Sequence, residues 1–314
     1  MTDRPAQLLE DVLAGPTALE GLLAAYDSPA GPLAGLASAL ATPHRFAFAG
    51  LGSSRYAALI AASDVRASGG SAWAEHASTS APTAPAQDLV FVAISASGRT
   101  REVVEAARRH RGRSFVVAVT NDPESALAAE ADHVLPLFAG SESAGIATRT
   151  FRATVAVLAM LVGRTPGSLR PTIARLVRAI EDRDRWLPPT ADAIDGSTAI
   201  DVLADARLLG LAEQAALMLR EAPRLPATAH DTGDWLHTAV YLALPGHRAL
   251  LFPGALADSE VIATIERRGG MVLPMPSSAA NADPFRRAIV ESVTAELLAA
   301  ELWRRTSAEE RQAP

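Results

Sequence analysis

The first half of the chain alternates short apolar runs with loops of small residues and helix-like segments. Apolar runs at residues 45–49, 88–94 and 115–119 are long enough for buried strands, and a polar loop follows each of them. Strands that are buried on both faces and joined by helices form a parallel sheet with helices on both sides. The sequence therefore predicts an α/β fold with a central parallel sheet.

The same pattern returns nearer the C-terminus, with strands expected at residues 206–210, 249–252 and 271–274. Residues 187–196 contain two adjacent prolines and end in a glycine, so this segment is the best linker candidate. The two halves look like two copies of one unit, the second one shorter. We expect a first domain over residues 1–187, including the leading helices, and a second domain over residues 188–314.

Composition excludes several classes of protein. The 314 residues include no cysteine and no lysine, which excludes disulfides, a thiol nucleophile, a Schiff-base lysine and a P-loop lysine. A net charge of -6 and an aromatic content of 5% argue against a nucleic-acid partner, because phosphate backbones require basic surface. No spacing among histidines and carboxylates resembles a metal site, so we expect no metal.

No apolar stretch reaches the roughly 20 residues of a membrane span, and the N-terminus lacks the pattern of a signal peptide. We therefore expect no membrane partner and a cytoplasmic location. Five histidines are interpreted as surface or structural residues: His44, His76, His110, His133 and His247.

Two loops of small polar residues follow expected strands, at residues 52–54 and 95–100. Ligands of open parallel sheets bind at the carboxyl ends of the strands, where peptide N–H groups, hydroxyls and a helix N-terminus can hold a phosphate without lysine. Each hydroxyl could instead simply cap a helix. Two such loops in neighbouring units favour phosphate binding. A dinucleotide site is disfavoured, because Arg55 stands where the G-x-G-x-x-G pattern needs a small residue.

At these loops the chain resembles the sugar isomerase (SIS) domain family, and the similarity runs over most of its length. "GLGSSRYAAL" is similar to the family's first ligand loop, and "ISASGRT" to its S-x-S-G-E-T signature. "GSESAGIATRTF" resembles G-T-E-x-G-V-A-S-T-K-x-F, and "LMLREAPRLPATAHDTGDWLH" resembles the stretch with the L-K-E and K-H-G-P elements. The chain most resembles the double-SIS isomerase half of glucosamine-6-phosphate synthase and the stand-alone phosphosugar isomerases and deaminases.

This resemblance implies two SIS domains, each a flavodoxin-like αβα sandwich with a central parallel sheet. It implies that a sugar phosphate is bound by the loops that contain Ser53, Ser54, Ser95, Ser97, Gly98 and Thr100. The segment of Gly145, Ile146 and Ala147 would line the sugar. No cofactor is implied, and a homodimer is expected.

The resemblance also implies that Glu221 moves a proton between C1 and C2, and that His237, its own or a partner subunit's, assists ring opening. A glutamate enclosed by apolar walls would have a raised pKa, as a proton shuttle needs. Glu221 could instead be a solvated carboxylate at a helix end, and His237 a packed histidine. His230 and Asp234 are weaker neighbouring candidates.

The chain departs from the family pattern at several positions. Ala96 and Arg99 replace the family's Gln and Glu, and its lysines are replaced by Met218, Arg220 and Leu236. An imine mechanism is therefore not available to this chain, since arginine stays protonated. Without cysteine we also expect no glutaminase activity.

The leading expectation is an aldose–ketose isomerase that acts on a sugar phosphate through an enediol. One alternative is an amino-sugar-phosphate deaminase that uses the same carboxylate. Another is a non-catalytic phosphosugar-binding or sensor protein, which the lost lysines and Ala96 favour. Glu221 and His237, both in register with the family motifs, favour an enzyme.

Overall fold

A computed structural model describes residues 3–36, 45–277 and 282–312, with side chains up to residue 306. His44 lies outside the described residues. The chain divides into two compact units, each with its own parallel sheet. The five-stranded unit comprises residues 17–140 and 149–173, and the four-stranded unit comprises residues 1–16, 141–148 and 174–314. The domain limits expected from the sequence stay a prediction.

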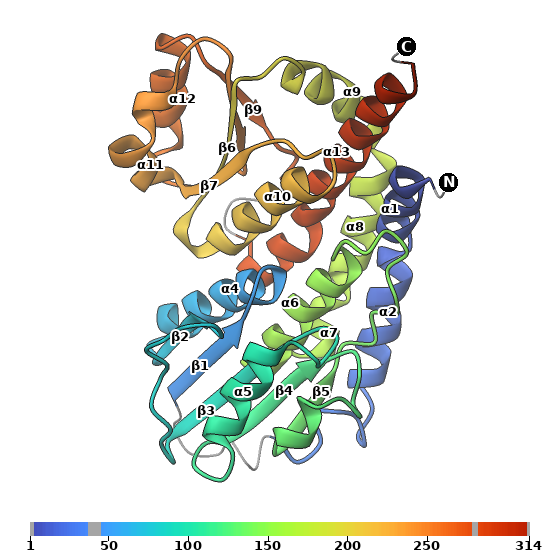
Figure 1. Cartoon of the computed structure of the whole chain (residues 1–314), viewed down its shortest axis with the longest axis vertical. Helices are drawn as coiled ribbons and strands as arrows, with labels where there is room; N and C mark the ends of the chain where they lie inside the picture. Colours follow the sequence, from blue (N-terminus) through green and yellow to red (C-terminus); the bar gives the residue numbers. More distant parts are fainter. Residues whose placement is uncertain (1–2, 37–44, 278–281, 313–314) are drawn as a thin grey trace. The chain divides into compact units, whose positions relative to one another are not determined.

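The five-stranded sheet has the order β2-β1-β3-β4-β5, and every neighbouring pair is parallel (Figure 1). This is the strand order of flavodoxin-like, doubly wound sheets. The expected α/β class and central parallel sheet are thus confirmed. The strands are β1 (Arg45–Gly50), β2 (Ala72–His76), β3 (Leu89–Ile94), β4 (Phe115–Thr120) and β5 (His133–Pro136).

Helices cover this sheet because its strands are apolar on both faces. All six residues of β3 are buried. Valines and alanines of α5 pack on one face of β1, β3 and β4, while α4 packs against α6 and β1. The helices of this unit are α2 (Gly15–Tyr26), α4 (Ser53–Ala67), α5 (Arg101–His110), η1 (Ala128–Glu130), α6 (Arg149–Leu161), α7 (Pro166–Leu169) and the start of α8 (Pro171–Glu181).

The four-stranded sheet has the order β7-β6-β8-β9 and is also fully parallel. The strand expected at residues 206–210 is wrong. The strand lies earlier, and residues 206–208 form the short helix η2 that leads into α10. The polar residue Asp201 interrupts the apolar run of residues 199–204, so the sequence pattern does not indicate a strand there. The strands are β6 (Ala199–Ala204), β7 (Ala227–Asp231), β8 (His247–Leu251) and β9 (Met271–Pro274).

The expected linker at residues 187–196 is also wrong, because helix α9 runs through it with Pro188 and Pro189 inside. A proline removes one N–H donor but has a helical φ, so a helix can tolerate it at some cost. Helix α9 also packs on α13, where Arg305 pairs with Asp192 at 2.7 Å.

The helices of the four-stranded unit are α1 (Arg4–Leu13), α9 (Arg183–Ile194), η2 (Ala206–Leu208), α10 (Leu209–Glu221), α11 (Thr232–Thr238), η3 (Val240–Leu242), α12 (Asp258–Arg267) and α13 (Pro284–Gln312).

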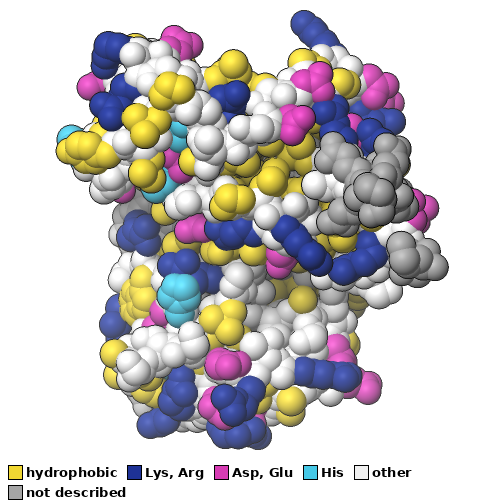
Figure 2. Space-filling model, turned by 45° about the horizontal axis from the view of Figure 1, so that its top comes forward, with side chains coloured by type: hydrophobic (Ala, Val, Ile, Leu, Met, Phe, Trp, Pro, Cys, Tyr) yellow, Lys and Arg dark blue, Asp and Glu magenta, His cyan; other side chains and the backbone are white. Residues whose placement is uncertain are grey.

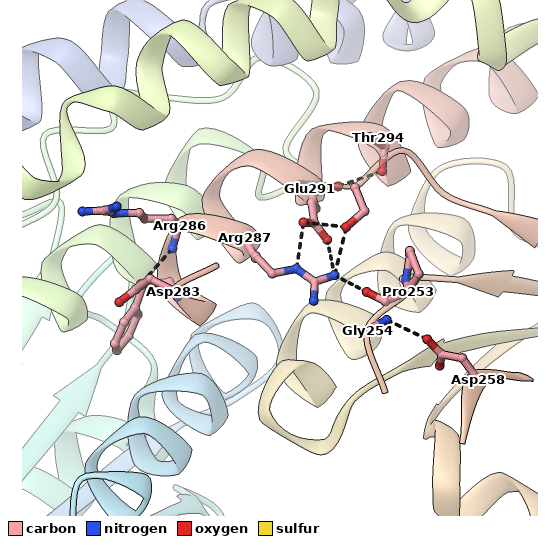
Figure 3. A network of polar contacts seen from close by, with 10 residues as sticks. Pro253, Gly254, Asp258, Asp283, Arg286, Arg287, Glu291 and Thr294 are labelled. Carbon is pink, nitrogen blue, oxygen red and sulfur yellow. Dashed lines mark hydrogen bonds and ion pairs between the residues drawn. The ribbon is translucent and has the colours of Figure 1, made fainter. Parts of the chain in front are cut away.

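A network of buried charges fixes the start of α13 (Figure 3). The carboxylate of Asp283 accepts hydrogen bonds from the first-turn N–H groups of Phe285 and Arg286. The buried guanidinium of Arg287 donates to Glu291 at 2.8 Å and to the carbonyl of Pro253 at 2.8 Å. These contacts tie α13 to the loop that follows β8.

A second buried polar cluster links three strands of the four-stranded sheet to α11. Asp201 Oδ2 accepts hydrogen bonds from Trp235 Nε1 at 2.7 Å and from His247 Nε2 at 2.9 Å, and Oδ1 lies 3.4 Å from His230 Nε2. Burial raises the pKa of Asp201, but the hydrogen bonds with His230, His247 and Trp235 together outweigh it, so the pKa is well below its usual range. The structural interpretation of His247 is confirmed.

Asp201→Asn should destabilise the protein by about 3 kcal/mol or more at pH 7, because it removes one partner of a buried charged cluster. The folded-state pKa of Asp201 is depressed, so its contribution is complete above the unfolded-state pKa of about 3.9 and is lost as the pH falls toward the folded-state value. Urea unfolding at pH 7 and below pH 4 measures this. The matched control, Asp88→Asn in an exposed pair with Arg45, should change little. An equal loss in both variants would contradict the prediction.

Gly98, in the turn after β3, has the left-handed φ of 62°, and a Cβ there would lie 2.3 Å from the Cβ of Ser125. Gly112 has a similar φ of 72° with no atom within 4 Å of such a Cβ. Gly112→Ala should therefore cost about 1 kcal/mol through backbone conformation alone. Gly98→Ala should cost roughly 1–3 kcal/mol more through the clash. Thermal unfolding of both variants decides this, and equal shifts would refute the close packing at Gly98.

Candidate functional site

The carboxyl ends of β1 and β3 form the point where the chain reverses direction across the five-stranded sheet. The chain leaves β1 toward β2 on one side and returns to β3 on the other. Ala49 and Ala93 are register partners near the ends of these strands, so the two loops that follow start side by side. Ligands of doubly wound sheets bind at such a reversal.

The loop after β1 turns directly into helix α4. A Cβ on Gly50 would lie 3.0 Å from the Cβ of Ser54 and 3.1 Å from the backbone N of Arg55, so a larger residue there would require the start of α4 to shift by a few tenths of an ångström. The N-cap residue is Gly52, which offers no side-chain cap. Ser53 and Ser54 are half-buried in the first helical turn, and their hydroxyls have no hydrogen-bond partner in the described part of the chain.

The loop after β3 leads into helix α5 in the same way. Thr100 is the N-cap residue, yet its side chain makes no capping hydrogen bond. Its hydroxyl instead lies 2.9 Å from the hydroxyl of the buried Ser95. The exposed Ser97 accepts a hydrogen bond of 3.2 Å from the N–H of Arg99. Helix capping therefore does not account for these hydroxyls.

The second loop is held by contacts with the end of β4. The carbonyl of Ala96 accepts hydrogen bonds from the N–H of Asn121 and the hydroxyl of Thr120, and the carbonyl of Gly98 accepts one from Leu127. The side chain of Arg99 is 76% exposed and pairs with Asp122 at 3.2 Å. These contacts fix the conformation of the loop that carries the hydroxyls.

Residues 141–148 form a loop of the four-stranded unit that several hydrogen bonds hold in place. Ala144 donates its N–H to Asp11 at 2.9 Å, and its carbonyl accepts from Arg4 at 2.9 Å. Glu142 accepts hydrogen bonds from the N–H and the hydroxyl of Thr148. Gly145 has a left-handed φ of 69°. The segment expected to line a sugar, Gly145–Ala147, is therefore held in one conformation from both sides.

Glu221 is the last residue of α10, and its side chain is exposed. The apolar enclosure expected from the sequence is not present in the described chain. The surrounding atoms still desolvate the carboxylate enough to raise its pKa, against the lowering effect of the Arg220 charge. The direction of the shift suits a proton shuttle.

His237 is exposed in the last turn of α11 and makes no hydrogen bond or ion pair among the described residues. The alternative interpretation as a packed histidine is therefore wrong. Exposed apolar side chains follow it closely, with Tyr241 71%, Leu242 62% and Leu244 56% exposed. His230, by contrast, belongs to the Asp201 cluster, and Asp234 is an exposed residue of α11.

The predicted residues fall into two sets. The structure brings the six residues of the two hydroxyl loops together in the five-stranded unit, while Gly145–Ala147, Glu221 and His237 belong to the four-stranded unit. Sequence reasoning missed Gln214, a buried residue of α10 that donates to the carbonyl of Ala147. A single amide within the apolar run "LAEQAALML" was the available signal.

One cavity of about 360 Å³ lies in the four-stranded unit and contains none of the predicted residues. Its lining comes from α8, α9, the segment after β9, and α13, and includes Arg175, Arg178, Trp186, Glu291 and Thr294. Within residues 3–36, 45–277 and 282–312, no group of three potential metal ligands occurs and no helix is long and apolar enough to cross a membrane. On the face drawn in Figure 2, basic and acidic side chains are interspersed.

Comparison with known proteins finds one family model that matches a segment containing both hydroxyl loops. The family model of the SIS domain matches residues 39–164. Glutamine–fructose-6-phosphate aminotransferase (isomerizing) from Aeropyrum pernix is 35% identical over 192 residues, which is 55% of this chain. The matched part spans only 30% of that relative's length.

Solved structures share the fold over almost the whole chain. The C-terminal domain of glucosamine-fructose-6-phosphate aminotransferase from Francisella tularensis has a TM-score of 0.81 at 18% identity, covering 95% of this chain and 96% of that one. Tagatose-6-phosphate ketose/aldose isomerase from Escherichia coli has a TM-score of 0.80 at 17% identity, covering 96% and 93%. The chain thus has a segment that matches the SIS domain, and an α/β fold that it shares with proteins named for sugar-phosphate chemistry.

Proposed function

We propose that this protein binds a sugar phosphate and interconverts its aldose and ketose forms. The observation that carries the proposal is that the hydroxyls at the starts of α4 and α5 do not cap those helices. They lie at neighbouring strand ends, beside two helix N-termini with positive dipole ends. Peptide N–H groups and hydroxyls can hold a phosphate there without a lysine.

The proton transfer is assigned to Glu221. Its carboxylate removes the proton from C2 of the open-chain aldose to give an enediol and returns it to C1, while the O2 proton moves to O1, so the product is the ketose. The raised pKa supports this role, since the base must also act as an acid near neutral pH. His237 would protonate the ring oxygen during opening. Gly145, Ile146 and Ala147 would line the sugar.

We further propose two SIS domains, with limits near residues 187 and 188. The four-stranded order β7-β6-β8-β9 repeats the order β2-β1-β3-β4 of the other sheet, which supports a second, shortened copy. Asp205 caps η2 where the first copy has its glycine-containing loop, so the second copy would bind no phosphate of its own. A cytoplasmic location belongs to the same proposal.

We also propose a homodimer. The exposed apolar residues Tyr241, Leu242 and Leu244 lie a few residues beyond His237, and clusters of this kind often mark contact surfaces. A second copy that covers them would lie within a few residues of His237 along the chain. Light scattering that shows a monomer at micromolar concentration would contradict this.

Two alternatives keep the same binding loops. A deaminase acting on an amino-sugar phosphate would use the same carboxylate, and a binding-only protein would use no carboxylate at all. The exposure of Glu221 and the absence of lysine favour the binding-only alternative. The register of Glu221 and His237 with the family motifs favours an enzyme.

Ser97→Ala should weaken sugar-phosphate binding by about 1–2 kcal/mol, the contribution of one hydrogen bond to a charged group, or roughly tenfold in dissociation constant. Calorimetric titration with hexose phosphates and amino-hexose phosphates measures this. Ser68→Ala, at the exposed C-terminal end of α4, is the matched control and should bind like the wild type. Unchanged affinity of Ser97→Ala would remove the loop from the site.

Glu221→Gln should abolish turnover but leave sugar-phosphate binding within about twofold, because the amide keeps the shape and cannot accept the proton. Exchange of the C2 proton with deuterium from solvent, followed by NMR, reports the first step directly. Glu213→Gln makes the same change on the same helix and should keep full activity. If the wild type exchanges no such proton in any hexose or amino-hexose phosphate, the binding-only alternative replaces the isomerase.

A further inference from the structure

The cavity of about 360 Å³ that α8, α9 and α13 line belongs to the four-stranded unit alone, because every residue of its lining falls between positions 174 and 314. Its lining contains no residue of the hydroxyl loops and neither Glu221 nor His237. Small-molecule sites of proteins usually measure about 300–1000 Å³. The cavity is therefore large enough for one small organic molecule, and it is distinct from the residues of the proposed function.

The part of the lining that α13 contributes is buried and held in place. Glu291 and Thr294 are each only 1% exposed. The carboxylate of Glu291 accepts hydrogen bonds from Arg287 at 2.8 and 2.9 Å and from the hydroxyl of Ser277 at 3.0 Å (Figure 3). The charge of Glu291 is thus already compensated, so this wall is preformed and does not call for a cation.

The part of the lining that α8 contributes carries two positive charges. Arg175 and Arg178 are three positions apart, so their side chains leave the same face of the helix. Both are exposed, and neither makes a hydrogen bond or an ion pair among residues 3–36, 45–277 and 282–306. Asp182 is the only lining carboxylate besides Glu291 in the described chain, so the guanidiniums leave an excess of positive charge. Guanidiniums bind carboxylates and phosphates through paired hydrogen bonds.

Apolar surface completes the cavity. The half-buried indole of Trp186 comes from α9, and the buried side chain of Val290 comes from α13. Ala179 and Pro276 add further apolar atoms. A flat aromatic side chain packs well against a ring and gains free energy by burying it. The cavity therefore combines a cationic part with a part suited to an apolar ring.

We propose that this cavity is a binding site for a small organic anion that carries an acid group on an apolar ring. Arg175 and Arg178 bind the acid group, and Trp186 and Val290 pack against the ring. An inorganic anion alone leaves the indole uncovered, and an uncharged ring leaves both guanidiniums without a partner. The proposal does not depend on the proposed function, because the two share no residue.

The test is calorimetric titration with 2-naphthoate, which has a carboxylate on an aromatic ring system. Arg178→Gln should raise its dissociation constant about tenfold, because the variant loses a charge-assisted hydrogen bond. Arg185→Gln makes the same change at an exposed arginine of α9 that does not line the cavity, and it should bind like the wild type.

Two further ligands separate the contributions of the acid group and the ring. The uncharged 2-naphthylmethanol keeps the ring system, and acetate keeps the carboxylate. Each should bind at least tenfold more weakly than 2-naphthoate, because each loses the contacts of one part of the cavity.

NMR of the indole N–H groups locates the bound molecule. The signal of Trp186 is identified by its loss in Trp186→Phe, and it should shift when 2-naphthoate is added to the wild type. An unshifted signal would place the molecule elsewhere and overturn the site.

Three other outcomes would also overturn the proposal. One is equal affinity of Arg178→Gln and Arg185→Gln for 2-naphthoate, and another is equal binding of 2-naphthylmethanol and 2-naphthoate. The third is a wild type that binds no 2-naphthoate at millimolar concentration. None of these measurements uses a sugar phosphate, so failure of the proposed function leaves their interpretation unchanged.

Discussion

The parallel pairing of β1 with β3 is the interaction on which the candidate phosphate site depends. It brings two strand ends together, and each strand passes into a helix within a few residues. Gly50 eases the first of these turns, because a side chain there would be in tight contact with the start of α4. Two helix N-termini then open at one edge of the sheet, and their unpaired N–H groups attract anions without any basic side chain. A chain without lysine can therefore build such a site from backbone and hydroxyls alone.

The strands that could be predicted from the sequence are those that a continuous run of apolar residues marks within the strand itself. β1, β3 and β4 are apolar on both faces because helices cover both sides of the sheet, so a continuous apolar run marks each strand. β6 could not be predicted, because Asp201 interrupts its run. The buried carboxylate is tolerated since Trp235 and His247 donate to it from other elements. No local pattern shows those partners. The edge strands β2 and β7 are half-polar and were missed for a related reason.

The candidate site shows the same limit. The sequence identified the hydroxyls of both loops but left open whether they cap helices or bind a ligand. In the first loop the N-cap residue is Gly52, one position before Ser53, so neither serine caps α4. In the second loop the hydroxyl of Thr100 contacts that of Ser95 and does not cap α5. The exposure of Glu221 could not be predicted either, because a glutamate at the end of an apolar helix can be buried or solvated.

The proposed phosphate binding and the proposed proton transfer differ in how many of their groups one copy of the chain holds in place. The proposed phosphate binding needs only the hydroxyls and N–H groups at the starts of α4 and α5, which one chain supplies. Proton transfer at carbon is helped by exclusion of water from the base, and both Glu221 and His237 are exposed in the single chain. The apolar residues Tyr241, Leu242 and Leu244 give a second copy a surface to cover next to His237. The isomerase proposal therefore depends on dimer formation more strongly than the binding-only alternative, for which an isolated chain suffices.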